Sequence, residues 1–433
     1  MTSFIRAATL LATLVFVSAP AADEPSKAAA ERGAKAVRGQ PAMNPALWSI
    51  KSFEDVWKQW DQKERPADFA KAVQERYGLH PAPYANAGLP MGLHVSQGFL
   101  GKGVINDCLL CHAGRVAGQT IIGVGNASLD LQGLFDDLSA SANLYFRVPV
   151  QVSYVRGTID PINPVTYLME FRDPETLKLL ATPMQLGYSK DVASDPPAWW
   201  LLKRKQTRNW NGGVKVNSIR VDMANLLTPL NSPEHIKSHE KTFADIHAFI
   251  MNNVAAPKYP FAIDAARAEQ GRGQFNETCA RCHGTYGPGG KYPNKIVPLD
   301  SLGTDRTLAA AQSPKLMEIF NTTWFSKEKG PDGTWYKVDQ TPGYQAPPLD
   351  GIWATAPYLH NASVPTIYHM LNSKARPQYW TRTFRTEKED YDAQRVGWKI
   401  TILDAPPDPK LPGYERRRIY DTTLPGRSNA GHT

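Results

Sequence analysis

Several features that define other protein classes are scarce or absent in this sequence. The 433 residues contain four cysteines, too few for the disulfide framework of a small secreted scaffold. After Ala22 no apolar run approaches the roughly 20 residues that a membrane-spanning helix needs. The net charge of +8 comes from scattered lysines and arginines without a dense basic run. We therefore expect no nucleic-acid partner and no stable membrane insertion of the mature chain.

The four cysteines form two short motifs. They are Cys108-Leu109-Leu110-Cys111-His112 and Cys279-Ala280-Arg281-Cys282-His283. In a Cys-x-x-Cys-His sequence the two thiols add to the vinyl groups of a haem, and the adjoining imidazole binds the iron. No other internal repeat and no low-complexity tract is visible.

Two disulfides, a zinc site and thioredoxin-like redox centres are the alternative interpretations of these motifs. A disulfide between cysteines three positions apart is strained, the gap between the motifs is far longer than in a zinc ribbon, and no βαβ pattern surrounds either pair. We therefore predict two covalently bound haem c groups. The attachment residues are Cys108, Cys111, Cys279 and Cys282, and the proximal iron ligands are His112 and His283.

The N-terminus has the pattern of a secretory signal. An uncharged apolar run from Ala7 to Ala19 follows Arg6, and small residues then precede Asp23. Haem attachment by the Cys-x-x-Cys-His motif takes place outside the bacterial inner membrane, so the signal and the motifs indicate one compartment. We expect residues 1–22 to be a signal peptide and the mature protein to be periplasmic.

Composition and spacing predict helices joined by long ordered loops. Thirty-five prolines, 32 glycines and 11 tryptophans favour loops wrapped around bulky apolar groups. Apolar residues recur at helical spacing in Phe53–Tyr77, Leu131–Leu144, Pro233–Val254, Asp264–Thr278 and Pro314–Thr322. The proline-bearing stretch Ala255–Phe261 is typical of a linker. We predict a mainly α fold of two cytochrome c-like helical domains, residues 23–255 with the first haem and 256–433 with the second.

Function depends on the sixth position of each iron. A haem with two strong protein ligands passes electrons, whereas an iron with an open position can bind peroxide or dioxygen. For the second haem the candidate ligands are His360, His369, Met370 and His432. For the first they are Met91, His94 and Met223, or no protein ligand at all.

Two further groups of residues have open interpretations. His235, His239 and His247 have helical spacing but no carboxylate or thiol partner in register, so we interpret them as a solvated or propionate-facing edge. Trp353 precedes His360 closely, and we select it as a catalytic candidate because an indole near two haems can carry a hole between them. Ordinary packing is the alternative role of this tryptophan.

A resemblance to a known family is carried by the segment Thr355-Ala356-Pro357-Tyr358-Leu359-His360. With the signal peptide and the two separated motifs, it resembles the bacterial di-haem cytochrome c peroxidase superfamily. The longer stretch 348–366 is most similar to the branch that includes the rubber oxygenases, as are Leu89–Leu93, Leu302–Asp305 and Leu424–His432. The resemblance extends over most of the mature chain.

The resemblance implies two cytochrome c-like domains with their haems edge to edge, the first haem meeting the oxidant and the second relaying electrons. It implies His432, rather than His360, as the distal ligand of the second haem. Because relatives continue into a final helix, we expect weak anchoring of His432, with His360 as the alternative ligand. It also implies a calcium ion between the domains, held by backbone oxygens of Thr355 and Pro357 and by an asparagine, for which Asn126 is a guess.

These expectations lead to a di-haem cytochrome c oxidoreductase of the peroxidase type. A small redox protein or a quinol-derived donor would supply electrons to the His283 haem, and peroxide would be reduced at the His112 haem. The alternatives are a dioxygen-activating oxygenase and a non-enzymatic electron carrier. The chain has no room for the large additions of the rubber oxygenases, so rubber itself is not the expected substrate.

Overall fold

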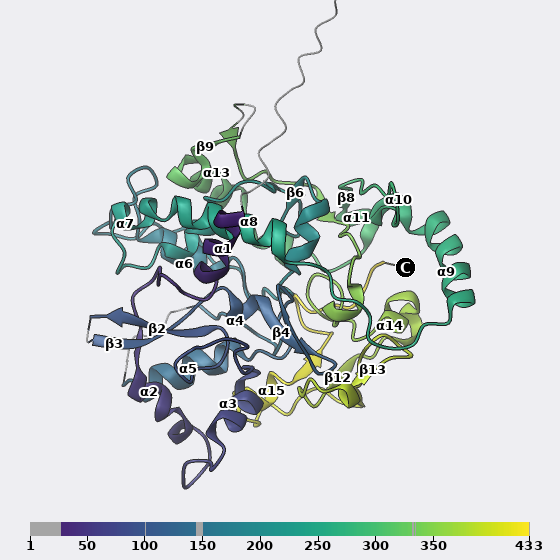
Figure 1. Cartoon of the computed structure of the whole chain (residues 1–433), viewed down its shortest axis with the longest axis horizontal. Helices are drawn as coiled ribbons and strands as arrows, with labels where there is room; N and C mark the ends of the chain where they lie inside the picture. The colour runs from purple at the N-terminus through teal and green to yellow at the C-terminus, as the bar shows by residue number, and fades with distance from the viewer. Residues whose placement is uncertain (1–26, 100, 144–149, 331–332, 334, 433) are drawn as a thin grey trace, which may run out of the picture.

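The computed structural model describes residues 27–99, 101–143, 150–330, 333 and 335–432 (Figure 1). The predicted signal peptide, residues 1–22, lies outside the described residues. In the described part no helix is long and apolar enough to cross a membrane.

The prediction of a mainly α fold is wrong, because 35% of the chain is helical and 14% lies in strands. The helices are mostly short. They are α1 (Lys27–Ala36), α2 (Ile50–Glu54), α3 (Phe69–Tyr77), α4 (Leu109–His112), α5 (Leu131–Ser141), α6 (Asn163–Glu170), α7 (Pro233–Ser238), α8 (Glu240–Asn253), α9 (Ala265–Thr278), α10 (Ala280–His283), α11 (Leu299–Leu302), α12 (Thr307–Ala311), α13 (Pro314–Thr322), α14 (Ile367–Leu371) and α15 (Gly413–Arg416).

The strands form several small antiparallel sheets. They are β1 (Trp48–Ser49), β2 (Leu93–Gly98), β3 (Gly101–Asn106), β4 (Ala113–Val116), β5 (Gln119–Ile122), β6 (Thr207–Arg208), β7 (Val214–Lys215), β8 (Ile296–Pro298), β9 (Glu328–Lys329), β10 (Trp335–Tyr336), β11 (Gly343–Gln345), β12 (Tyr379–Thr381), β13 (Tyr391–Asp392), β14 (Gly397–Trp398), β15 (Thr401–Leu403) and β16 (Ile419–Asp421). Two sheets have three strands, in the orders β1-β3-β2 and β15-β12-β16. Strands of two to six residues are too short for a periodicity search to detect, which explains the wrong fold class.

The longer helices agree with the sequence. Asp264–Thr278 and Pro314–Thr322 are confirmed as α9 and α13. The predicted helix Leu131–Leu144 corresponds to α5, which ends at Ser141, and Leu144 lies outside the described residues. Phe53–Tyr77 contains the end of α2 and the whole of α3. The predicted helix Pro233–Val254 is divided at His239 into α7 and α8. Ser232 caps α7 because its hydroxyl accepts a hydrogen bond from the backbone N–H of His235 at 3.1 Å.

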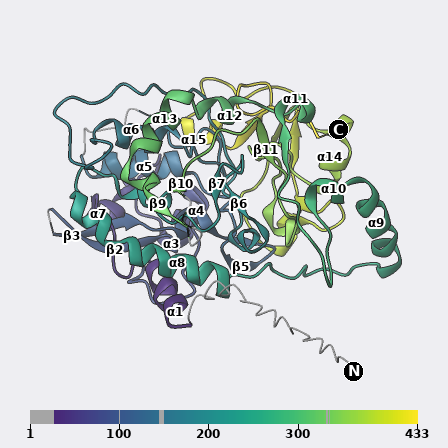
Figure 2. The ribbon, with the colours of Figure 1, turned by 90° about the horizontal axis from the view of Figure 1, so that it is seen from above.

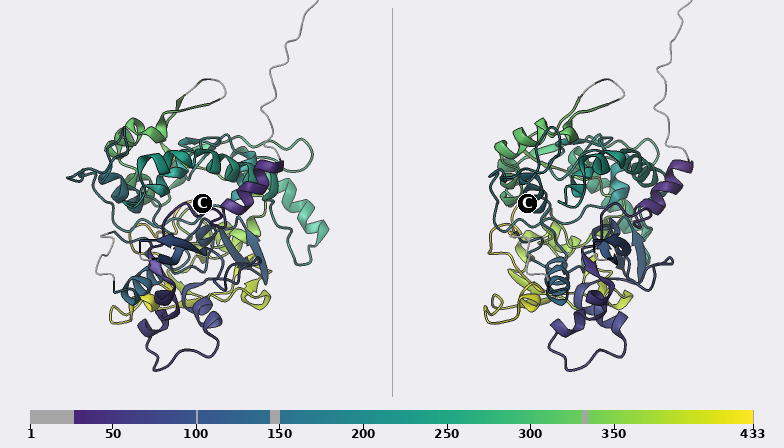
Figure 3. Two further views of the ribbon diagram at one scale, coloured as in Figure 1. Left: turned by 60° about the vertical axis from the view of Figure 1, so that its left-hand side comes forward. Right: turned by 90° about the vertical axis from the view of Figure 1, so that its left-hand side faces the viewer.

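Helices α1 and α8 pack closely against each other in both views of Figure 3. Gly33 allows this approach, since a Cβ at that position would lie 1.9 Å from the carbonyl oxygen of Asp245. Arg32 closes the contact through two hydrogen bonds to the Asp245 carboxylate, at 2.6 and 2.7 Å. The N-terminal helix is thereby fixed to a helix more than 200 residues further along the chain.

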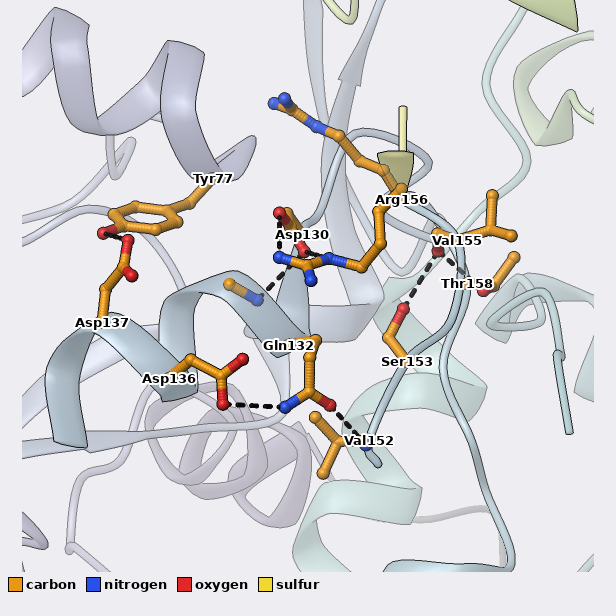
Figure 4. A network of polar contacts seen from close by, with 12 residues as sticks. Tyr77, Asp130, Gln132, Asp136, Asp137, Val152, Ser153, Val155, Arg156 and Thr158 are labelled. Carbon is orange, nitrogen blue, oxygen red and sulfur yellow. Dashed lines mark hydrogen bonds and ion pairs between the residues drawn. The ribbon is translucent and has the colours of Figure 1, made fainter. Parts of the chain in front are cut away.

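Two apolar clusters surround the first Cys-x-x-Cys-His motif. One cluster includes Trp60, Tyr77 and Leu110 and lies behind α4. Trp60 donates a hydrogen bond to the Tyr77 hydroxyl. That hydroxyl in turn donates to Asp137 of α5 (Figure 4). The network therefore joins α3 and α5 behind the motif.

The other cluster is the largest apolar core. It contains Val37, Leu109 and Phe249 of the predicted first domain, and Phe325 and Trp398 of the predicted second domain. Side chains from both sides of the predicted boundary near residue 255 thus share one core. The division of the chain into two domains stays a prediction.

Helix α9 lies at one edge of the molecule in Figure 1 and in Figure 2. None of its described residues is buried. Asp264 caps its first turn by accepting hydrogen bonds from the backbone N–H groups of Ala266 and Arg267. The helix leads directly into Cys279 and α10.

Candidate haem centres

The first motif forms a single helical turn, α4, held at both ends by the surrounding chain. The carboxylate of Asp107 accepts a hydrogen bond from the backbone N–H of Leu109 at 2.8 Å, as an N-terminal cap does. Gly92 packs against the same turn, since a Cβ there would lie 2.4 Å from the Cα of Leu110, and its φ is +92°. A hairpin, β4 and β5, follows at once, with its turn at Ala117 and Gly118 in the left-handed region.

The His112 imidazole is oriented by the backbone of a proline pair. Its Nδ1 donates to the carbonyl oxygen of Pro197 at 3.2 Å, with the tautomer assigned from that acceptor. The ring stacks on the Trp199 indole, with centroids 5.1 Å apart. Burial lowers the pKa of His112 to about 4, so the ring is neutral at pH 7. A neutral imidazole with Nδ1 engaged leaves Nε2 free to bind a metal.

The cysteines of the first motif lie beside this ring. Burial raises the pKa of the Cys108 and Cys111 thiols to about 12, with the nearby Asp107 carboxylate adding to the shift. Both side chains line the same cavity as His112. Their placement agrees with thioether attachment, which uses the two thiols and the imidazole from one helical turn.

The second motif repeats this arrangement with another proline pair. His283 ends α10, and its Nδ1 donates to the carbonyl oxygen of Pro347 at 2.8 Å. Burial lowers the pKa of His283. Cys279, Cys282 and His283 all line the cavity. Each predicted proximal ligand is therefore held by a proline carbonyl through the nitrogen that faces away from the metal position.

His432 lies opposite His283. The ring centroids are 5.9 Å apart, and the ring planes differ by 55°. Two imidazoles that bind one metal at about 2 Å from each nitrogen have centroids about 6 Å apart. The distance between the rings is therefore one at which His283 and His432 would both hold a single iron. Burial lowers the pKa of His432, so this ring too favours the neutral form that binds metal.

The chain around His432 is anchored. Arg376 donates hydrogen bonds to the carbonyl oxygens of Asn429 and Gly431, at 2.5 and 2.8 Å. The backbone N–H of His432 donates to the carbonyl oxygen of Leu302 at 3.1 Å. These contacts fix the terminal segment, which we had expected to be weakly held.

His360 has a different environment. Its ring lies against Tyr344, with centroids 4.3 Å apart, and its carbonyl oxygen accepts a hydrogen bond from the backbone N–H of Asp195. It lines the cavity, and burial lowers its pKa to about 4. Between His432 and His360, the structure therefore places the ring of His432 against His283.

The other candidate ligands lie elsewhere. Met91, His94 and Met223 are buried and are absent from the described cavity lining. His94 lies beside Asp107, with Nδ1 3.4 Å from a carboxylate oxygen. His369 contacts the Thr366 hydroxyl at 2.7 Å and is also absent from the lining, whereas Met370 is part of it.

The three histidines of α7 and α8 do not form one cluster. The Nε2 atoms of His235 and His239 lie 3.2 Å apart, and His235 also contacts the carbonyl oxygen of Met43. His247 lines the cavity separately. Among the described residues no group of three or more His, Cys, Asp or Glu side chains could hold a metal ion by itself.

One cavity of about 3,030 Å³ contains both motifs. Pockets for ordinary small molecules have volumes of about 300–1,000 Å³, so this cavity can hold a ligand set several times larger. Its wall includes the cysteines and histidine of each motif, together with His360 and His432. The structure therefore brings together residues that the sequence places in separate domains.

Trp353 does not reach this cavity. It is 5% exposed, its indole N–H donates to the carbonyl oxygen of Pro257 at 2.9 Å, and it packs against Tyr259 and Tyr391. It is absent from the described lining. Its catalytic role stays a prediction, and its contacts are those of a packing residue.

Two tryptophans that we did not select lie closer to the predicted proximal histidines. Trp199 lines the cavity, whereas Trp200, like Trp353, is absent from the described lining. Trp199 stacks on His112. Trp200 donates its indole N–H to the carbonyl oxygen of Asp350 at 2.7 Å, close in sequence to Pro347. The sequence signal was the pair Trp199-Trp200, one residue after the proline pair Pro196-Pro197. With eleven tryptophans in the chain, spacing alone did not single out this pair.

The comparisons with known proteins agree with this site. Residues 343–381 match the RoxA-like, cytochrome c-like family. This stretch includes Pro347, the carbonyl partner of His283, and the whole segment 348–366. It carries a c-type cytochrome-like domain, which implies haem c binding. Within that class the match is consistent with the rubber-oxygenase-like branch.

Two relatives from Sinorhizobium fredii (strain NBRC 101917 / NGR234) are similar to this chain. The uncharacterized protein y4iM is 28% identical over 264 residues, covering 55% of this chain and 56% of y4iM. The uncharacterized protein y4iJ is 28% identical over 230 residues, covering 41% of this chain and 36% of y4iJ. The aligned part of the chain therefore spans about half of one relative and about a third of the other.

Proposed function

We propose that this chain is a periplasmic c-type cytochrome with two haems that works as an oxidoreductase. A small redox protein or a quinol-derived donor supplies electrons on the His283 side, and a small oxidant is reduced on the His112 side. The observation that carries the proposal is the difference between the two proximal histidines. His283 faces the ring of His432, whereas among the described residues no second histidine ring packs against His112.

The residues present fit the proposed cofactor. Haem c at both motifs supplies one-electron transfer and, at an iron with a free face, reduction of dioxygen or peroxide. His112 and His283 would be its proximal ligands, and His432 the distal ligand at the second motif. The carbonyl oxygens of Pro197 and Pro347 hold the two proximal rings in the tautomer that leaves Nε2 free.

Trp200 provides a connection between the two proximal histidines. The Nδ1 of His112 is bonded to the Pro197 carbonyl, and the chain from Pro197 leads in three residues to Trp200. The Trp200 N–H is bonded to the Asp350 carbonyl, and the chain from there leads back to Pro347 and His283. The route consists of two short backbone segments and three hydrogen bonds, so we assign it the electron transfer between the two sides.

Dioxygen is the oxidant that the comparisons favour, with an apolar organic molecule as the second substrate. The RoxA-like match supports an oxygenase. The exposed apolar side chains Leu47, Phe99, Leu179 and Leu230 all belong to the cavity lining, with exposed fractions of 45%, 95%, 54% and 56%. Exposed apolar side chains gathered at a cavity are typical of entry sites for apolar ligands.

Peroxide is the second candidate oxidant, because peroxide cleavage needs a proton donor and a carboxyl lies in the cavity wall. Asp195 belongs to the lining, and burial raises the pKa of its carboxyl well above the ordinary value. A raised pKa is the shift that a carboxyl needs to act as a general acid. The exposed apolar side chains Leu47, Phe99, Leu179 and Leu230 have no role in this second reaction.

The test combines spectroscopy with product analysis of the purified full chain. Intact mass should show two covalently bound haems, and the ferric spectrum should contain one low-spin and one high-spin component. Incubation of an isoprenoid oil with ¹⁸O₂ should give labelled carbonyl products if dioxygen is the oxidant. Turnover of peroxide with a reduced small cytochrome, without labelled product, would select the peroxidase. A wholly low-spin spectrum that peroxide and carbon monoxide leave unchanged would contradict both enzymes and leave an electron carrier.

A further inference from the structure

A second, much smaller cavity lies away from the haem centres. Its volume is about 10 Å³, which is about the space of one water-sized guest. The residues around it come from both halves of the chain. They are Ala127, Val155, Arg156, Gly157, Pro357, Ala362, Trp380, Arg382, Phe384, Arg418 and Tyr420.

The lining of this small cavity carries three positive charges. Arg156, Arg382 and Arg418 surround the Phe384 ring, with guanidinium carbons 4.5, 4.5 and 5.3 Å from its centroid. Arg156 and Arg382 are each 5% exposed. Among the described residues that line the cavity there is no carboxylate. Cation–π contacts stabilise each arginine but do not neutralise it.

The hydrogen bonds of the two buried arginines go to neutral oxygens. Arg156, on the segment drawn in Figure 4, donates to the carbonyl oxygens of Ser128 and Glu75 at 2.7 and 2.8 Å. Arg382 donates to the carbonyl oxygen of Ala127 at 2.6 Å and to the Ser128 hydroxyl at 3.1 Å. Burial lowers the pKa of Arg156 to about 9, because a charged guanidinium is less stable away from water.

The nearest carboxylates are engaged with other arginines. Asp130 accepts two hydrogen bonds from Arg417, at 2.7 and 3.0 Å. Asp390 accepts from Arg385 at 3.2 Å. The excess positive charge at the small cavity is therefore not balanced by a direct ion pair within the described chain.

An independent observation points to an acceptor in the same place. Trp380 lines the cavity and is 3% exposed, and its indole nitrogen has no hydrogen-bond partner among the described residues. Its ring is fixed by stacking on Tyr420, with centroids 5.2 Å apart and planes 2° apart. An indole N–H only donates hydrogen bonds, and leaving such a donor unpaired costs about 1–3 kcal/mol.

The small cavity is not the calcium site that the family resemblance implies. Of the two expected backbone ligands, Pro357 lines both cavities, whereas Thr355 lines only the large cavity. The calcium ion stays a prediction. A divalent cation does not suit the small cavity itself, because three guanidinium groups surround it and none of the described carboxylates lines it.

We propose that this cavity is a binding site for a small monovalent anion of the size of chloride. The anion accepts a hydrogen bond from the Trp380 N–H and offsets the charge of Arg156, Arg382 and Arg418. It thereby joins the segment that carries Arg156 to the C-terminal segment that carries the other two arginines. The assignment does not depend on the haem chemistry.

Crystallography with a heavier halide tests the site directly. Crystals of the haem-loaded protein grown in sodium bromide should give an anomalous peak inside the small cavity, within hydrogen-bond distance of the Trp380 indole nitrogen. Parallel crystals grown with calcium acetate and without halide should contain no calcium there. A bound calcium ion, or an ordinary water with no bromide peak, would overturn the assignment.

A solution experiment uses a matched pair of tryptophan variants. At constant ionic strength, replacing gluconate with chloride should raise the Tm of the protein by about 1–2 °C. Trp380→Phe keeps the ring stack but removes the N–H, so it should lose most of this rise. Trp335→Phe changes an indole that is 51% exposed, and this variant should keep the rise in Tm. A Tm that does not respond to chloride in the unmodified protein contradicts the proposal, whether or not Trp380→Phe folds.

Discussion

Replacing His432 with alanine tests the ligand arrangement from which the proposed function follows. The His283 and His432 centroids lie 5.9 Å apart, which leaves room for one iron about 2 Å from each ring nitrogen. An alanine methyl group cannot bind iron, so the second haem should lose its distal protein ligand. Since the proposed function has an open first haem, the high-spin fraction of the ferric protein should rise from about half to nearly all.

The assay is electron paramagnetic resonance of the ferric protein, supported by its optical spectrum at neutral pH. His360→Ala is the matched control, because His360 also lines the cavity but packs on Tyr344 instead of facing His283. It should leave the low-spin signal in place. An unchanged spectrum of His432→Ala, or loss of the low-spin signal in His360→Ala, would refute the assignment of His432. Bound haem per chain should be measured for both variants, so that loss of cofactor is not mistaken for a change of ligand.

Three further predictions concern stability and electron transfer. Gly33→Ala places a Cβ 1.9 Å from a carbonyl oxygen of α8, so it should lower the free energy of unfolding in urea by about 1–3 kcal/mol. Gly273→Ala has no atom within 4 Å of its Cβ and should raise the free energy of unfolding by about 0.5–1 kcal/mol. Burial lowers the pKa of His80 from 6.5 to about 4, so below pH 6.5 the unfolded chain takes up a proton that the folded chain does not. The free energy of unfolding should therefore fall by up to about 3 kcal/mol between pH 6.5 and 4, and His80→Gln should remove that part of the decrease. Trp200→Phe should slow the electron transfer between the two haems that stopped-flow measures. Trp353→Phe removes a similar buried hydrogen bond and should lower the free energy of unfolding by about 1–2 kcal/mol, but it should leave the electron-transfer rate unchanged.

The sequence contained enough information to predict the attachment residues, which stay a prediction. A Cys-x-x-Cys-His motif specifies its own local geometry, because five consecutive residues supply both thiols and one imidazole. Long amphipathic segments such as α9 and α13 were also predictable from their spacing. The contact between the rings of His283 and His432 could not be derived from spacing, since His432 reaches His283 only after a long chain of loops has folded.

Other parts of the site depend on contacts that produce no repeating pattern in the sequence. The carbonyl groups of Pro197 and Pro347 act through the backbone, so residue type alone does not disclose their role. Trp353 and Trp200 both donate an indole N–H to a carbonyl, but only Trp200 connects to the chain beside a proximal histidine. The short sheets were missed for a similar reason, since two or three residues per strand do not establish an alternating pattern.

The shared cavity has a consequence for the biogenesis of the protein. Its wall is assembled from residues as far apart as Met43 and His432, and much of that wall is apolar. A space of about 3,030 Å³ with such walls would collapse without contents, because folded interiors tolerate few large voids. In the proposed two-haem protein, ligation of both porphyrins must therefore precede final closure of the chain. A cell without the lyase that forms the thioether bonds should accumulate an open polypeptide, which its proteases would degrade.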